Sequence, residues 1–172
     1  LVQGNHGRLE INTYKAKVIV RNQDGALNVD NFAGETLLEK NKGAVEINVG
    51  QGAAKLMQNS GSLQFDMQKG NLTVSAHSGR IEGQNGEGNL TLSSVGESDV
   101  SVKSKSGRVV VQTPAGSGAL LNVSTAEGEL ALPGSLRPNH DGSGKSFRGR
   151  MAGVGAKGSV VVHSQQGSIV IR

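Results

Sequence analysis

One stretch of the chain reads GALNVDNFAGETLLEKNKGAVEINVGQGAAKLMQNSGSLQFDMQKGNLTV, residues 25–74, and contains a unit that recurs along the sequence. The unit is glycine, any residue, an apolar residue, any residue and a second apolar residue. One set of units begins every 18 residues, at Gly7, Gly25, Gly43, Gly61 and Gly79. A second set, offset by nine, begins at Ala16, Gly34, Gly52, Gly70 and Gly88. After an extra residue near Gly96 the units resume at Ser98 and Gly107, and less regular copies begin near Gly128, Gly158 and Gly167.

The alternation of apolar and polar residues within each unit is typical of a β-strand with one buried face. Each expected strand has about five residues and is followed by about four residues that suit a tight turn. Units that repeat at a constant spacing stack as coils of a solenoid, and equivalent strands then pair in parallel. Because parallel crossovers are right-handed, the sequence predicts an all-β, right-handed, single-stranded parallel β-helix with about 18 residues per coil.

Polar positions follow the same spacing. Amide side chains at one turn predict a stacked ladder in which each bonds its equivalent in the next coil: Asn5, Gln23, Asn41 and Asn59. Outward positions of the first strand alternate carboxylate with amide: Glu10, Asn28, Glu46, Gln64 and Glu82. This alternation keeps like charges two coils apart.

The length of 172 residues suits one domain. We expect regular coils over residues 1–132, an irregular Gly- and Arg-rich insertion over 133–157, and closing strands over 158–172. The repeat is in register by Gly7. We therefore expect the first coil to be covered by an upstream domain, by end-to-end self-association, or by residues 1–6 folding over it.

The amino-acid composition excludes several classes of function. The chain has 26 glycines, one tyrosine, three phenylalanines and no cysteine or tryptophan. Without cysteine there is no disulfide framework, thiol nucleophile or cysteine-ligated metal. No apolar run approaches the ~20 residues of a membrane span, and no signal peptide opens the sequence.

The units SGSL (60–63), SGRI (78–81) and SGRV (106–109), each followed by alternating apolar residues, resemble the bacterial adhesin-like β-helix domains of the auto-transporter-adhesin head-GIN type. The ending TAEGELALP (125–133), a Gly- and Arg-rich stretch and GVGAKGSVVVHSQQGSIVIR (153–172) are similar to that family's close. The resemblance implies a right-handed β-helix in a bacterial envelope or secreted protein, of unknown function and without catalytic residues.

Motifs associated with catalysis or cofactors lack their structural context. GVGAKG (153–158) precedes a strand-like run, whereas a dinucleotide fingerprint precedes a helix, and GSGKS (142–146) lacks the rest of a phosphate loop. The turns lack the aspartate of calcium-binding β-rolls, and the four histidines share no metal-ligand spacing. Glu10, Glu46 and Glu82 are expected on a flat polar face. We therefore assign no catalytic, cofactor or metal-binding residue.

Charge is uneven along the chain. Residues 133–172 contain six basic residues and one acidic residue, and most of the basic ones lie where the repeat is interrupted. Loops on a rigid scaffold frequently carry binding residues. The candidate anion-binding residues are Arg137, Lys145, Arg148 and Arg150. Specific nucleic-acid binding is not expected, because only Phe147 could stack on a base there.

These observations favour a non-enzymatic, extracytoplasmic β-helix that serves as a structural or adhesin-like binding module. Its partner would be an anionic polysaccharide or an envelope surface, and its signal or anchor would lie outside this sequence. The alternatives are a carbohydrate-active β-helix enzyme, either a lyase or a hydrolase, and an envelope-stress sensor domain. An enzyme would need a groove with clustered acids and bases and aromatic rings that stack on sugars.

Overall fold

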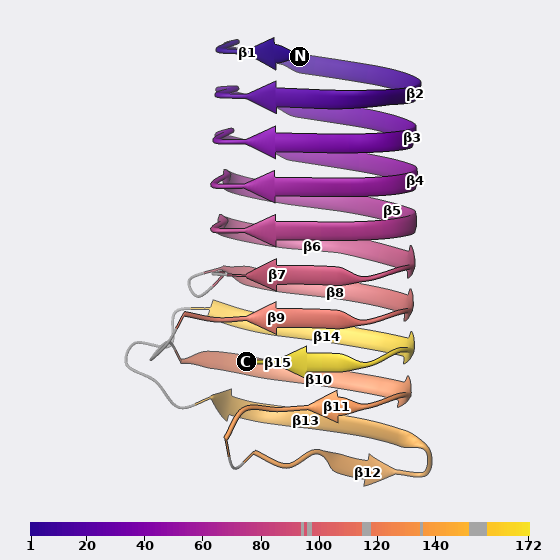
Figure 1. Cartoon of the computed structure of the whole chain (residues 1–172). Helices are drawn as coiled ribbons and strands as arrows, with labels where there is room; N and C mark the ends of the chain where they lie inside the picture. Colours follow the sequence, from indigo (N-terminus) through magenta and orange to yellow (C-terminus); the bar gives the residue numbers. More distant parts are fainter. Residues whose placement is uncertain (94, 96–97, 115–117, 135, 152–157) are drawn as a thin grey trace.

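The computed structural model describes residues 1–93, 95, 98–114, 118–134, 136–151 and 158–172, and all the regular structure in them is β-strand (Figure 1). The first coils are formed by β1 (Val2–Gln3), β2 (Leu9–Arg21), β3 (Leu27–Glu39), β4 (Val45–Met57) and β5 (Ser60–Ser75). Neighbouring coils pair in parallel at an offset of 18, as in Leu9↔Leu27 and Leu27↔Val45. The predicted parallel β-solenoid is thus confirmed.

Later coils are divided into shorter strands. They are β6 (Ser78–Glu87), β7 (Leu90–Ser93), β8 (Asp99–Ser106), β9 (Val109–Gln112), β10 (Ala119–Glu127), β11 (Leu130–Ala131), β14 (Gly158–Gln166) and β15 (Ile169–Ile171). A hairpin consists of β12 (Asn139–Asp141) and β13 (Gly144–Met151). None of the described residues forms a helix that could cross a membrane.

The two bends of each coil differ, which the nine-residue unit does not predict. In β2 to β5 the strand continues through one bend, where a short turn was expected, and the pairing with the next coil skips a single position there, that of Tyr14, Phe32 and Gly50. A glycine such as Gly52, at a φ of +131°, lets the main chain curve there without leaving the ladder. At the other bend the chain leaves the sheet through a left-handed residue, such as Asn22 or Lys40.

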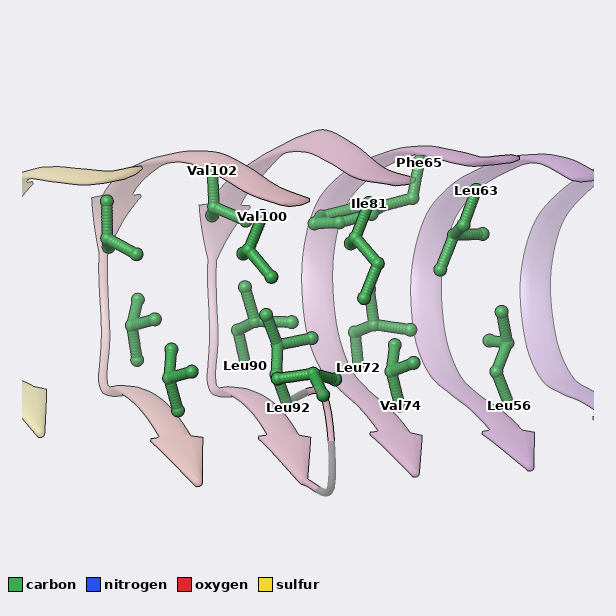
Figure 2. Packing of buried hydrophobic residues seen from close by; sticks show 14 of the residues in the cluster. Leu56, Leu63, Phe65, Leu72, Val74, Ile81, Leu90, Leu92, Val100 and Val102 are labelled. Carbon is green, nitrogen blue, oxygen red and sulfur yellow. The ribbon is translucent and has the colours of Figure 1, made fainter. Parts of the chain in front are cut away.

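The interior is one continuous apolar column. Inward residues of consecutive coils, such as Leu63, Phe65, Ile81 and Leu72, are at most 2% exposed and pack against one another between the two strand arms (Figure 2). Because each rung contacts mainly the rungs of the neighbouring coils, stability is distributed along the stack.

The predicted amide ladder is present, but most of its bonds involve the main chain. Asn5 Nδ2 donates to Gln23 Oε1 at 2.9 Å, as expected. In the next two coils the backbone N–H groups of Gln23 and Asn41 donate to the side-chain oxygens of Asn41 and Asn59, at 2.9 and 2.8 Å. The next position at this spacing is His77, whose Nε2 atom lies 3.2 Å from the Gly61 carbonyl oxygen and whose burial lowers its pKa.

The coil that is last in the sequence is not the last coil of the stack. β14 pairs with β8 on one side and β10 on the other, and β15 lies between β9 and β11 (Figure 1). The closing strands were expected over residues 158–172 at the end of the stack, and this placement is wrong. These residues instead fill the space of one coil, between the coil of β8 and β9 and the coil of β10 and β11. We call β14 and β15 the inserted coil.

The end of the stack is instead covered by the β12–β13 hairpin. β13 pairs antiparallel with β10 from Ala119↔Met151 to Thr125↔Lys145, and β12 pairs with β13. The segment expected as an irregular insertion therefore forms regular antiparallel structure over residues 139–151. Residues 152–157, which include most of GVGAKG and Lys157, lie outside the described part.

Candidate functional site

Each coil has two strand segments, a first strand arm before the continuous bend and a second strand arm after it. The outward side chains of the first strand arm form a regular polar surface, which we call the outer face. In each of the first five coils this face has one carboxylate and one amide, and their order reverses from coil to coil. The pairs are Glu10 and Asn12, Asn28 and Asp30, Glu46 and Asn48, Gln64 and Asp66, and Glu82 and Gln84. The parallel register therefore converts the sequence repeat into a two-column pattern of acceptors and amides.

Arginines pair with carboxylates at two places on this surface. An Arg8 guanidinium nitrogen lies 4.0 Å from Glu10, and Arg80 pairs with Glu82. Asn48 Nδ2 donates to Asp30 Oδ1 at 2.7 Å, between adjacent coils. On the second strand arm, Lys17 lies 2.8 Å from Glu35 and lowers the pKa of this carboxyl group by a hydrogen bond and by charge. These exposed pairs contribute little to stability.

A hollow lies where the outer face meets the continuous bend, and we call it the corner groove. Its volume is about 600 Å³. The rings of Tyr14 and Phe32 stack beside it, with centroids 5.0 Å apart and planes within 5° of parallel, and they are 77% and 51% exposed. The groove is lined by Asn12, Thr13, Tyr14, Asp30, Asn31, Phe32, Asn48, Val49, Gly50, Asp66 and Gln68.

A second hollow continues the corner groove towards the C-terminal end of the stack. Both hollows are lined by Asp66 and Gln68. The second hollow is also lined by Lys103, Lys105 and His163, the last of which comes from the inserted coil. The bend therefore has an acidic end and a basic end, and the inserted coil contributes to the basic end.

The four predicted anion-binding residues do not form one cluster in the structure. Arg148 and Arg150 are exposed on the same side of β13, opposite Asn122 and Leu120 of β10. Lys145 alternates to the other side, and its Nζ atom lies 2.7 Å from Glu129 Oε1. That pairing lowers the pKa of the Glu129 carboxyl group.

Arg137 precedes the hairpin and donates to the carbonyl oxygen of Leu136, at 3.3 Å. It therefore lies outside the strand that carries the two exposed arginines. Of the four candidates, Arg148 and Arg150 alone form a common basic surface. Neither one takes part in an ion pair with another residue in the described ranges.

One serine–histidine contact was not expected from the sequence. Ser124 Oγ lies 2.7 Å from His163 Nδ1 across the pair of β10 and β14. A nucleophile–base pair needs a third group that orients the base. The hydrogen bonds of the described residues give His163 no such partner. The same residues contain no group of three histidine, aspartate or glutamate side chains that could hold a metal ion.

Comparison with known proteins adds no relative. Neither protein-family models, curated proteins nor solved structures match the chain. The resemblance to adhesin-like β-helix domains therefore stays a prediction from short motifs, and the assignment of function depends on the surface of the molecule itself.

Sequence reasoning missed the corner groove. The signal was available, because Tyr14 and Phe32 are 18 residues apart and the chain has only four aromatic residues. The constant coil spacing places such a pair on adjacent rungs. The carboxylates considered from the sequence are Glu10, Glu46 and Glu82, whereas those that line the groove beside the stacked rings are Asp30 and Asp66.

Proposed function

We propose that this protein is a non-enzymatic, structural or adhesin-like binding module, and that it acts outside the cytoplasm, in the bacterial envelope or after secretion. The observation that carries the proposal is the periodic outer face, with one carboxylate and one amide in each of five successive coils. A rigid surface whose groups recur at the coil spacing is suited to a ligand that is itself a repeating polymer.

The basic surface at the end of the stack supplies a test of binding. Arginine side chains make forked hydrogen bonds with phosphate, sulfate and carboxylate groups. Arg148 and Arg150 lie two residues apart on one strand face and are free to make such contacts. The proposed partner of this surface is an anionic polysaccharide or anionic envelope lipid.

Changing Arg148 and Arg150 together to Gln is expected to weaken retention on heparin and on anionic vesicles several-fold. Wild-type retention should fall as salt rises, because charges separated by more than about 8 Å are screened at physiological ionic strength. Lys145→Gln is the matched control, since Lys145 faces Glu129 and should affect retention little. Circular dichroism checks that each variant stays folded. Equal retention of wild type and double variant would remove the basic surface from the proposal.

A carbohydrate-active enzyme is the second candidate, and the corner groove is the observation that favours it. Asp30 and Asp66 line the groove and lie two coils apart, roughly 10 Å by the spacing of parallel strands. Inverting glycosidases separate their two carboxyl groups by about 6.5–9.5 Å. Release of reducing ends from a polysaccharide panel by the wild type, and its loss in Asp66→Asn, would favour the enzyme over the binding module.

A further inference from the structure

We propose that the corner groove binds a glycan chain of pyranose rings that carries no negative charge, with a sugar ring lying against Phe32 and Tyr14. This inference rests on the proposed binding function and names a ligand class for it. It concerns a different surface from the one formed by Arg148 and Arg150, so the two can fail separately.

The aromatic pair is the first reason. Two of the four aromatic side chains are held in the open, whereas Phe65 is 2% exposed and Phe147 packs against the core. An exposed pair of stacked rings presents apolar faces and edges to solvent at a definite position. The C–H groups on the face of a pyranose ring make favourable contacts with such a surface, and aromatic side chains line most small-molecule sites.

Gly50 leaves space next to the rings. The residues on either side of it pair with those on either side of Phe32, so Gly50 occupies the next rung of the same column and the aromatic stack stops there. A Cβ atom at Gly50 would lie 2.7 Å from the Phe32 carbonyl oxygen and 3.2 Å from the ring itself. The absence of a side chain at this rung therefore opens the groove between Phe32 and Gln68, where a sugar ring can enter.

Polar groups around the rings suit hydroxyl and amine recognition. Asp30 accepts a bond from Asn48 and has further acceptor capacity, and the carboxylate of Asp66 is exposed. Beneath them, Thr13 Oγ1 donates to Asn31 Oδ1 at 2.9 Å, and Asn31 Nδ2 donates to the Ala16 carbonyl oxygen at 3.1 Å. The buried Asn31 therefore holds the floor of the groove in place.

The charges of the groove select the kind of glycan. The residues that line it around the aromatic pair include two carboxylates, Asp30 and Asp66, and no basic side chain. Uronic acid polymers would be repelled there, whereas neutral sugars are tolerated and protonated amino sugars are attracted. The basic residues Lys103 and Lys105 lie further along the bend.

The direction of the groove suits a chain. The two hollows share Asp66 and Gln68, so the groove follows the solenoid axis over successive coils. Each coil advances by about 4.8 Å, the spacing of paired strands. This rise is close to the length of one pyranose unit in an extended polymer, so successive sugars can meet equivalent rungs.

Intrinsic fluorescence offers a direct measurement, because the chain has one tyrosine and no tryptophan. The signal therefore comes from Tyr14, at the proposed site. Titration of the whole chain with a glucosamine hexamer should change this fluorescence saturably, cellohexaose should do so more weakly, and a galacturonic acid hexamer should bind at least tenfold more weakly than the glucosamine hexamer. Tightest binding of the galacturonic acid oligomer would overturn the proposal.

Substitutions test where the glycan binds. Binding to these variants is measured by calorimetry, which does not depend on the fluorescence of Tyr14. Phe32→Ser should weaken glucosamine-hexamer binding at least tenfold, and Asp66→Asn several-fold with little effect on cellohexaose. Leu120→Ser is the matched control, since Leu120 is 50% exposed against 51% for Phe32 and lies on β10 at the other end of the stack. Equal loss in Phe32→Ser and Leu120→Ser would overturn the assignment.

Three further outcomes separate the proposals. If an aromatic or proline-rich peptide binds the groove and no glycan does, the ligand class is wrong. If the double change of Arg148 and Arg150 to Gln abolishes heparin retention while no glycan binds the groove, the binding function stands and this inference fails. If glycan binding persists in that double variant, the groove acts independently, as proposed.

Discussion

Val162→Asp is expected to lower the free energy of unfolding by about 4 kcal/mol or more, which is a large fraction of the total stability of an ordinary domain. Val162 is 0% exposed and lies between Val102 of β8 and Val123 of β10. A carboxylate there would be buried among apolar side chains on both sides of the inserted coil and would have no partner. Denaturant melts followed by circular dichroism measure the change.

The neighbouring residue provides the control. Val161→Asp should cost no more than about 1 kcal/mol, because Val161 points to the outer face and its change mainly alters strand propensity. If β14 were the last strand of the stack, Val162 would pack against one coil only and its substitution would cost much less. Similar, small losses for both variants would therefore contradict the insertion.

Gly52→Ala is expected to destabilise the protein by about 4 kcal/mol. Gly52 has a φ of +131°, which side chains other than glycine rarely adopt, and its Cβ atom would overlap the carbonyl oxygen of Gly34 in the preceding coil. The strained conformation contributes about 1–3 kcal/mol, and the required shift of a packed main chain adds a similar amount. Thermal or denaturant melts of the purified variant measure the total.

Gly142→Ala separates the two causes. Gly142 has a φ of +60° in the hairpin turn, but a Cβ atom there has nothing within 4 Å. This change should cost about 1–2 kcal/mol, the penalty of the left-handed conformation alone. The chain already tolerates such a conformation without glycine, as at Ala76 with a φ of +52°. If the two substitutions cost the same, close stacking of the coils is not what requires glycine at Gly52.

The 18-residue spacing was enough to predict the fold and the register of the first coils. It placed Leu27 beside Val45 and Glu46 beside Gln64, because a solenoid repeats the same backbone path in each coil. It did not predict that the strand continues through one bend. Whether a strand continues through a bend depends on backbone pairing with the neighbouring coils. The apolar alternation describes each coil separately and does not contain this information.

The position of the inserted coil could not be predicted. The units at Gly158 and Gly167 have the same apolar alternation as the others, and each is compatible with pairing to any neighbouring coil. Their place depends on the space of one coil between the coil of β8 and β9 and the coil of β10 and β11. A local pattern contains no information about such long-range order.

The candidate sites, like the fold, could be predicted from the sequence only in part. The charge count pointed to the C-terminal segment, but strand alternation decided that Arg148 and Arg150 face together while Lys145 turns to Glu129. The corner groove was hidden because its residues are scattered in sequence and meet only through the stacking of coils. The spacing of Tyr14 and Phe32 was the one local sign of it.

Disulfide formation between introduced cysteines tests the order of the coils most directly, and the natural chain contains no cysteine to interfere. Ser101 and Val161 are paired in adjacent strands, with Cα atoms about 4.8 Å apart, within the range that a disulfide spans. Ser101 and Asn122 lie two strands apart, roughly 10 Å, because β14 lies between them. The structure predicts rapid oxidation of the pair at 101 and 161 and none at 101 and 122. A bond at 101 and 122, with free thiols at 101 and 161, would contradict it.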